Sequence, residues 1–121
     1  MDEEMTRNLE IVKEIAYLTK DWDGYGAEMF SEALIQKCRN ILRCLKFQPQ
    51  IFPTGRQSIQ FQYELEDRSY LEFEIFEEKT IYLLVPKRIY SNAETAELSS
   101  DEEARIKEMT DSFYGEKSSG K

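Results

Sequence analysis

The chain has 121 residues, of which 40% are hydrophobic and 33% charged, and its net charge is −8 at neutral pH. A chain of this length builds one hydrophobic core, so we expect a single domain over residues 1–115 and a flexible tail over residues 116–121. A surface this acidic is repelled by nucleic acid and by anionic membranes. The charge therefore argues against direct binding to either and favours a basic protein as the partner.

The first part of the sequence predicts two amphipathic helices. Apolar residues recur at helical spacing over residues 3–20 and again over residues 31–45. Ser31 is well suited to cap the second helix at its N-terminus. The two cysteines, Cys38 and Cys44, lie on different sides of this helix, so we expect both to remain reduced thiols.

The beginning of the chain carries no recognisable targeting signal. The segment MDEEMTRNLE is acidic and lacks the apolar core of a signal peptide. No apolar run in the sequence reaches the length of a membrane-spanning helix. We therefore expect a cytoplasmic protein without a membrane partner.

Between the two helices lies a compact turn, Asp21-Trp22-Asp23-Gly24-Tyr25-Gly26-Ala27-Glu28. Its glycines let the backbone wrap tightly, and the favoured interpretation is structural, with Trp22 closing one end of the core. The alternative is a binding loop with exposed aromatic and carboxylate groups. The spacing of the glycines does not match a phosphate-binding loop.

Residues 50–86 predict the centre of the fold, an antiparallel meander of three to four short strands. Apolar and polar residues alternate strictly over residues 59–66, and residues 71–75 repeat the pattern. Residues 80–85 are almost entirely apolar, so we expect this strand to be more covered than the others. A short strand precedes these three, followed by a turn in which Gly55 is free to adopt a positive φ.

The alternation gives the predicted sheet two unlike faces. One face carries the aromatic and aliphatic residues of the core, including Phe61 and Phe73. The other face carries amides and carboxylates, which bind lysine and arginine through charge-assisted hydrogen bonds. These residues form the first part of the predicted partner site: Gln60, Gln62, Glu64, Glu66, Glu72 and Glu74.

A third helix is expected after a loop over residues 87–92. The sequence Ser100-Asp101-Glu102-Glu103 is a capping-box pattern, with Ser100 as the N-cap and Glu103 at the third helical position. The helix is predicted to run to about Tyr114 and to stop at Gly115. Its first turn supplies the second part of the predicted partner site: Asp101, Glu102 and Glu103.

The residue types argue against catalysis. The chain contains no histidine, which removes the commonest general base, the commonest zinc ligand and the usual partner of a nucleophilic cysteine. Carboxylate pairs such as Glu72 and Glu74 can perform acid–base or metal chemistry, but an open sheet face does not exclude water from them. We therefore expect no enzymatic activity, cofactor or metal, and a carboxylate-dependent metalloenzyme is the least favoured alternative.

Two stretches of the sequence carry a resemblance. The segment Trp22-Asp23-Gly24-Tyr25-Gly26-Ala27, together with Pro53-Thr54-Gly55 and the following Ser58-Ile59-Gln60-Phe61, resembles a set of small bacterial and phage-associated proteins that accompany mobile elements. The resemblance also includes the acidic strand over residues 70–75 and spans about residues 8–86. It implies a compact α+β domain and supplies no catalytic residues.

The sequence as a whole predicts an α+β domain, with two N-terminal helices packed on one face of the meander and a C-terminal helix after it. By size and charge the chain is similar to phage-encoded inhibitors of bacterial defence enzymes, including anti-CRISPR proteins. We expect a non-enzymatic inhibitor of a basic, nucleic-acid-binding enzyme such as a CRISPR effector.

The alternative is an immunity- or antitoxin-like partner of a co-encoded protein. It would use either the turn around Trp22 or the apolar stripe of the third helix, which consists of Ile106, Met109 and Phe113. A homodimer formed through the sheet edge or through the third helix is a further alternative.

Overall fold

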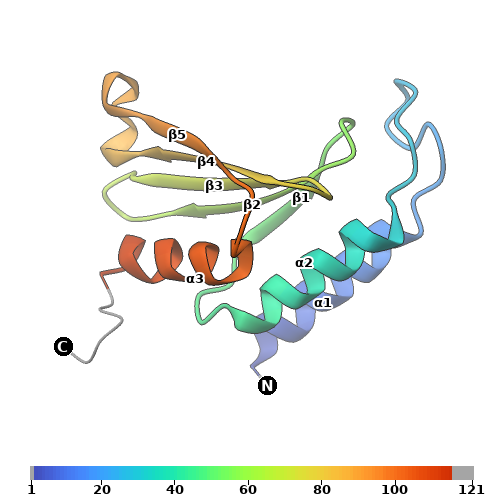
Figure 1. Ribbon diagram of the computed structural model, residues 1–121, viewed down its shortest axis with the longest axis horizontal. Helices are drawn as coiled ribbons and strands as arrows, with labels where there is room; N and C mark the ends of the chain where they lie inside the picture. Colours follow the sequence, from blue (N-terminus) through green and yellow to red (C-terminus); the bar gives the residue numbers. More distant parts are fainter. Residues whose placement is uncertain (1, 116–121) are drawn as a thin grey trace.

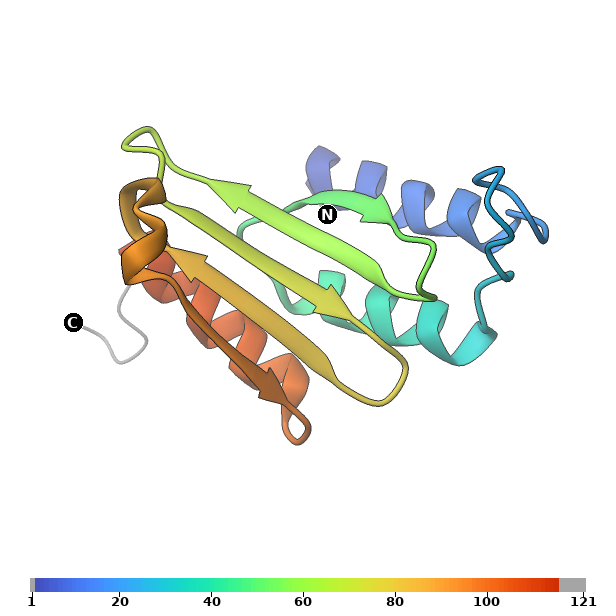
Figure 2. The same ribbon diagram turned by 90° about the horizontal axis from the view of Figure 1, so that it is seen from above.

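The computed structural model describes residues 2–115, in which an antiparallel sheet has its helices on one side only (Figure 1, Figure 2). The helices are α1 (Glu3–Ala16), α2 (Glu32–Cys44) and α3 (Glu102–Phe113). The strands are β1 (Gln50–Pro53), β2 (Ile59–Glu64), β3 (Tyr70–Ile75), β4 (Thr80–Val85) and β5 (Glu94–Leu98). The predicted α+β class is confirmed, but the described sheet has five strands instead of three or four.

The strands lie in space in the order in which they occur in the chain, and each is antiparallel to its neighbour. At the centre of the sheet Phe61 of β2 lies opposite Phe73 of β3, and both are fully buried. Because side chains alternate along a strand, this register turns the apolar residues of both strands toward the helices. Their amides and carboxylates lie on the opposite face, as the alternation predicts.

The helices cover the apolar face of the sheet. α1 packs against α2 and β1, and α2 also contacts α3. The helical residues that are fully buried, or nearly so, are Val12, Ile15, Leu34, Cys38, Ile41, Leu42 and Ile106. Each buried aliphatic side chain of this kind contributes about 1.5–3 kcal/mol to folding before conformational entropy is counted.

The ends of the first two helices follow from local hydrogen bonds. Ser31 Oγ accepts from the Leu34 backbone N–H at 3.1 Å, so the predicted N-cap of α2 is confirmed. α1 is shorter than the predicted range of 3–20. It ends at Ala16 because the chain then enters a turn that is closed by Asp21, whose backbone N–H donates to Ala27 O at 2.6 Å.

Three expectations for the second half of the chain are wrong. β4 is not more covered than its neighbours, because no helix lies over Ile81 and Leu83 on the outer side of the sheet. The sequence predicts no strand at β5, since ETAEL has no apolar alternation, although these residues pair with β4. Residues 87–92, expected as a plain loop, contribute to two 3-10 turns, η1 (Pro86–Arg88) and η2 (Tyr90–Asn92).

The capping box of α3 is also absent. The helix begins at Glu102 and its N-cap is Asp101, which has a φ of 50° and makes no capping hydrogen bond through its side chain. Ser100 lies before this position. Glu102 and Glu103 instead turn toward α2, where they meet Lys37 and Cys44 respectively.

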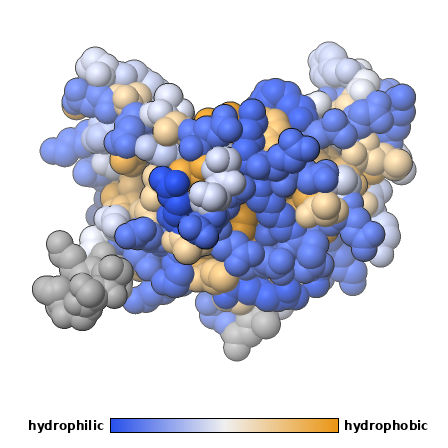
Figure 3. Space-filling model, in the orientation of Figure 1, coloured by the Kyte–Doolittle hydropathy of each residue, from blue (hydrophilic) through white to orange (hydrophobic). Residues whose placement is uncertain are grey.

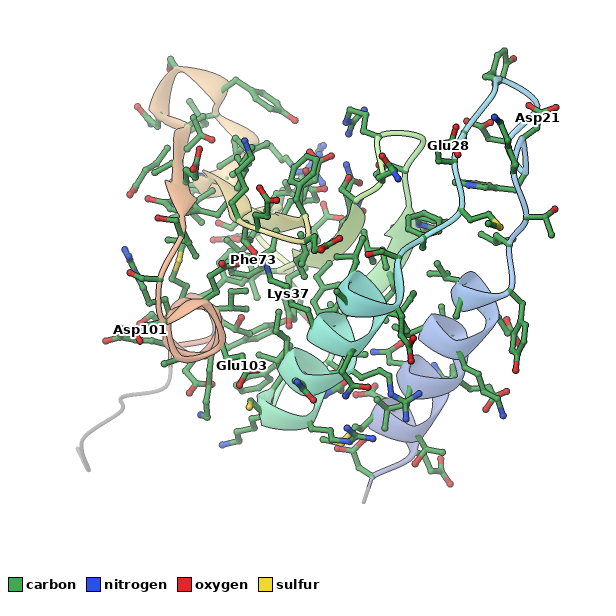
Figure 4. All side chains as sticks on the ribbon, turned by 45° about the vertical axis from the view of Figure 1, so that its right-hand side comes forward. Asp21, Glu28, Lys37, Phe73, Asp101 and Glu103 are labelled. Carbon is green, nitrogen blue, oxygen red and sulfur yellow. The ribbon has the colours of Figure 1, made fainter. Side chains whose placement is uncertain are left out.

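Lys37 ties α2 to the β3–β4 turn and to α3. Its Nζ donates to Phe76 O at 2.6 Å and lies 2.7 Å from Glu102 Oε1, and Thr80 Oγ1 donates to the same carboxylate oxygen at 2.7 Å. Figure 4 shows Lys37 in the space between α2 and the sheet. The side chains of Lys37 and Glu102 are only 17% and 14% exposed, so solvent screens this ion pair weakly.

We expect Lys37→Ala to lower the free energy of unfolding by about 3 kcal/mol, because the substitution leaves the Glu102 carboxylate buried without its cation. Urea denaturation followed by circular dichroism measures the change. Lys20→Ala is the matched control, since Lys20 and Glu28 form a pair at 3.4 Å whose side chains are 69% and 55% exposed. It should cost less than about 1 kcal/mol. Equal losses in the two variants would contradict the assignment.

Candidate functional site

The face of the sheet turned away from the helices, here called the outer face, carries no helix in the described part of the chain (Figure 2). Only its end at Val85, which lies opposite Tyr70, is fully buried. The cross-strand registers assign its side chains: Gln50, Phe52, Gln60, Gln62, Glu64, Tyr70, Glu72, Glu74, Ile81, Leu83, Val85, Thr95 and Glu97. The surface dips over this face, between one projection formed by residues 86–92 and another formed by the α1–α2 loop with the β1–β2 turn (Figure 3). The outer face is therefore the floor of a shallow saddle.

Glu74 lies on the outer face but is already engaged. Arg56 donates to Glu74 Oε2 from both Nε and Nη2, at 2.9 and 2.7 Å, and Ser58 Oγ donates to the same oxygen. The Glu74 side chain is only 15% exposed. The Glu74 carboxylate is therefore occupied by an arginine of the same chain and not by a partner. Through Arg56 and Ser58 it holds the β1–β2 turn against β3.

Glu64 is engaged in the same way near the opposite end of the face. Arg88 Nη2 lies 3.3 Å from Glu64 Oε2, and its guanidinium stacks over the ring of Tyr70 at 4.3 Å from the centroid. Lys87 and Arg88 both have positive φ angles, of 52° and 60°, which are costly for residues with a side chain. This strained turn is the feature that carries Arg88 onto the outer face, and nothing in the sequence predicts it.

Glu72 has no cation beside it among residues 2–115. It accepts a hydrogen bond from Tyr70 Oη at 2.7 Å. Burial and the hydrogen bond to Glu72 raise the pKa of Tyr70, because both favour the protonated hydroxyl that donates to the carboxylate. Across the strands Glu72 lies between Gln62 and Leu83. It is a half-buried carboxylate of β3 that has no ion-pair partner within residues 2–115.

The sequence did not identify the apolar part of the outer face. Leu83 lies opposite Glu72, and Ile81 lies opposite Glu74, so aliphatic side chains run directly beside the carboxylates. The near-continuous apolar sequence of β4 was the available signal. It could not be used without the strand register, which decides the neighbours of each side chain.

The remaining predicted site residues do not join this face. Glu66 lies in the β2–β3 turn because β2 ends at Glu64, so it is not part of the strand row, although it lines the same surface hollow as Gln62 and Glu64. Asp101, Glu102 and Glu103 lie at the start of α3, on the helix side of the sheet (Figure 1, Figure 4). Glu102 is buried in its pair with Lys37, so the second acidic patch retains only Asp101 and Glu103 as exposed groups.

The two stretches that carry the sequence resemblance lie against each other. A Cβ atom placed on Gly55 would lie 2.8 Å from Asp23 Oδ2 and 4.0 Å from Ala27 Cβ. Gly55 is therefore needed for close approach of the two loops. The expectation of a positive φ there is wrong, and Gln57 takes that conformation instead, at 61°.

Trp22 and Tyr25 of the α1–α2 loop differ in their exposure to solvent. Trp22 is half-buried and packs on Phe30, with 5.8 Å between the ring centroids, as the structural interpretation of this turn predicts. Tyr25 is 92% exposed, as the binding-loop interpretation predicts. Asp23 Oδ1 accepts from the backbone N–H groups of Tyr25 and Ala27, so the turn is rigidly built even though its tip is exposed.

Comparison of the chain with protein-family models, with curated proteins and with solved structures finds no match. The resemblance to small phage-associated proteins therefore stays a prediction. Within residues 2–115, no group of three carboxylates or thiols could hold a metal ion. No helix in this range has both the length and the apolar character needed to cross a bilayer.

We expect Cys44 to be the thiol that reacts with iodoacetamide in the folded protein, because Cys38 is buried and its burial raises the pKa of the thiol to about 12. Partial burial and the nearby Glu103 carboxylate, 3.8 Å from Sγ, also raise the pKa of Cys44. Glu103→Gln should therefore lower that pKa and speed alkylation several-fold at pH 8. Glu108→Gln is the matched control. An unchanged rate in Glu103→Gln would contradict the contact.

We expect Gly55→Ala to displace Asp23 and to loosen the α1–α2 loop, with a loss of about 1–2 kcal/mol in unfolding free energy. The fluorescence of Trp22, the only tryptophan in the chain, reports the movement. The same glycine substitution is also made in an Asp23→Ala background, which completes a double-mutant cycle. If the clash is with the Asp23 carboxylate, Gly55→Ala should cost much less in the Asp23→Ala background than in the wild type. Additive losses would contradict this explanation.

Proposed function

We propose that the chain is a non-enzymatic protein-binding module whose outer face docks on a basic partner. The observation that carries the proposal is that the carboxylate of Glu72, which has no ion-pair partner within residues 2–115, lies beside the aliphatic side chain of Leu83 on a sheet face that carries no helix. Lysine and arginine have the same composition, an aliphatic stem that ends in a cation. A partner side chain can therefore lay its stem along Leu83 and place its charge on Glu72.

The carboxylates of the outer face already bind two guanidinium groups of the same chain. Arg56 is bound by Glu74, and Arg88 is bound by Glu64 and stacked on Tyr70. These contacts support the proposed chemistry, because the same face offers carboxylates and an aromatic ring in positions suited to planar cations. They also leave fewer free carboxylates than the sequence predicts.

The partner class that fits best is a nucleic-acid-binding enzyme. Such an enzyme concentrates arginine and lysine in the groove that receives phosphates, and an acidic chain with a net charge of −8 is attracted to that groove. The specific form of the proposal is a phage or mobile-element inhibitor of a bacterial enzyme such as a CRISPR effector. Occupation of the groove would block nucleic acid without any chemical step.

A second candidate, an immunity- or antitoxin-like partner of a co-encoded protein, is supported by the exposed Tyr25. The apolar stripe of α3 gives this alternative less support, since Ile106 is fully buried in the core and Met109 and Phe113 are half-buried. Tyr25→Ser distinguishes the candidates. It should abolish binding if the loop is the contact and leave it unchanged if the outer face is.

We expect Glu72→Lys to weaken partner binding about 10- to 100-fold, because it places a cation where the partner's cation docks. Capture from a bacterial lysate, washed at low and then high salt, identifies the partner, and titration of the purified partner measures the affinity. Glu10→Lys on the exposed side of α1 makes the same charge change on the opposite side of the molecule and should bind like the wild type. Equal affinity of the Glu72→Lys variant would contradict the site.

A further inference from the structure

One edge strand of the sheet, β5, has outward backbone groups that are unpaired in the described part of the chain. β5 is the last strand of the sheet, and Glu94, Thr95, Ala96 and Glu97 are all exposed (Figure 2). Apart from the ladder with β4, no hydrogen bond within residues 2–115 reaches the backbone of Glu94–Leu98. An unpaired row of backbone N–H and C=O groups matches one kind of occupant in particular, another extended chain.

The opposite edge is protected. β1 ends at Pro53 and follows Pro49, and proline cannot donate to an added strand. The Pro49 carbonyl is already used, since Asn8 Nδ2 donates to it at 2.9 Å, and α1 packs against β1. β5 contains no proline, and the described helices leave its edge open. The two edges therefore differ in whether their backbone N–H and C=O groups are free to pair with an added strand.

An apolar groove of about 440 Å³ adjoins β5 on the inner side of the sheet. Leu71 and Leu84 from the strands and Met109 and Phe113 from α3 supply its apolar lining. Glu94 lies at its rim, where Tyr82 Oη donates to Glu94 Oε2 at 2.6 Å. Glu94 is the residue of β5 in the groove lining, so a strand laid along β5 would direct the inward side chain next to Glu94 toward this groove.

We propose that the β5 edge and this groove form a strand-addition site for an extended segment of a protein partner in which apolar residues alternate with lysine or arginine. The apolar side chain next to Glu94 enters the groove, and the other inward side chains lie beside Ala96 and Leu98. The outer set lies beside Thr95 and Glu97, which face the same side as Glu72. This inference deepens the proposed function and rests on it, because the segment belongs to the same basic partner.

Charge complementarity selects this occupant over a second copy of the chain. Both acidic residues of β5, Glu94 and Glu97, are exposed, and pairing of two copies would bring together two chains that each carry a net charge of −8. A basic strand meets the same carboxylates favourably. The acidic edge thus disfavours self-pairing and admits the partner.

The test uses a fluorescently labelled peptide of about eight residues in which lysine and valine alternate, a length that matches one strand. Titration with the full chain is followed by fluorescence anisotropy, and amide chemical shifts locate the site. We expect saturable binding, with shifts confined to β5 and the groove residues. The same peptide with alternate backbone amides N-methylated should lose binding at least tenfold, because it cannot donate to the β5 edge.

Glu97→Lys should weaken binding of the lysine–valine peptide about tenfold. Glu10→Lys, which changes the net charge equally, should leave it unchanged, and circular dichroism confirms that both variants are folded. Unchanged affinity for the N-methylated peptide, or shifts centred on Glu72 instead of β5, would overturn the strand site. Self-association through β5 in sedimentation analysis would overturn it too, because a second copy would then be the occupant.

The two proposals fail separately. If Glu72→Lys abolishes capture of the partner while the lysine–valine peptide does not bind, the strand site is wrong and the outer face stands. If the peptide binds β5 but capture of the partner is insensitive to Glu72→Lys, the outer-face site is wrong.

Discussion

The pairing of Phe61 with Phe73 at the centre of the sheet determines the orientation of every side chain on β2 and β3. A shift of one residue would move the apolar rows of both strands into solvent and their carboxylates into the core. This register therefore decides where the helices pack, since α1, α2 and α3 all lie on the face that holds the two phenylalanines (Figure 1). It also places the amides and carboxylates of β2 and β3 on the opposite face, which carries no helix, so the outer face is a direct consequence of the core.

Intramolecular pairing reduces the acidity of the outer face. Arg56, Arg88 and Lys79 each lie within 4.0 Å of one of its carboxylates, which belong to Glu74, Glu64 and Glu97 respectively. Each of these pairs has at least one solvent-exposed side chain, so solvent limits its contribution to stability, but the pairs hold their side chains in defined positions. The face is thus a pattern of alternating charge and aliphatic surface. Such a pattern favours specificity for a shaped basic partner over indiscriminate attraction to any cation.

Much of the fold was predictable because its signals are local. The alternation in β2 and β3 and the cap at Ser31 each act within a few residues. The site was harder to predict, because its decisive contacts join distant segments. The pair of Arg56 with Glu74 follows only from the strand register, and the pair of Lys37 with Glu102 follows only from the packing of α3 on α2. The strained turn that delivers Arg88 and the strand ETAEL have no local signature, since β5 forms only because β4 offers it an edge.

The outer face and the β5 edge are continuous, and their continuity explains why an acidic chain can leave a strand edge open. Gln62, Glu72, Leu83 and Thr95 lie side by side across four strands, so a strand added to β5 extends this row by one more position. A basic side chain on that strand would lie next to the carboxylates of the outer face, and its backbone would satisfy the edge. One partner can therefore use both surfaces at once. In this proposal the negative charge that attracts such a partner also opposes pairing of two copies of the chain, so protection of the edge and recognition of the partner would depend on the same residues.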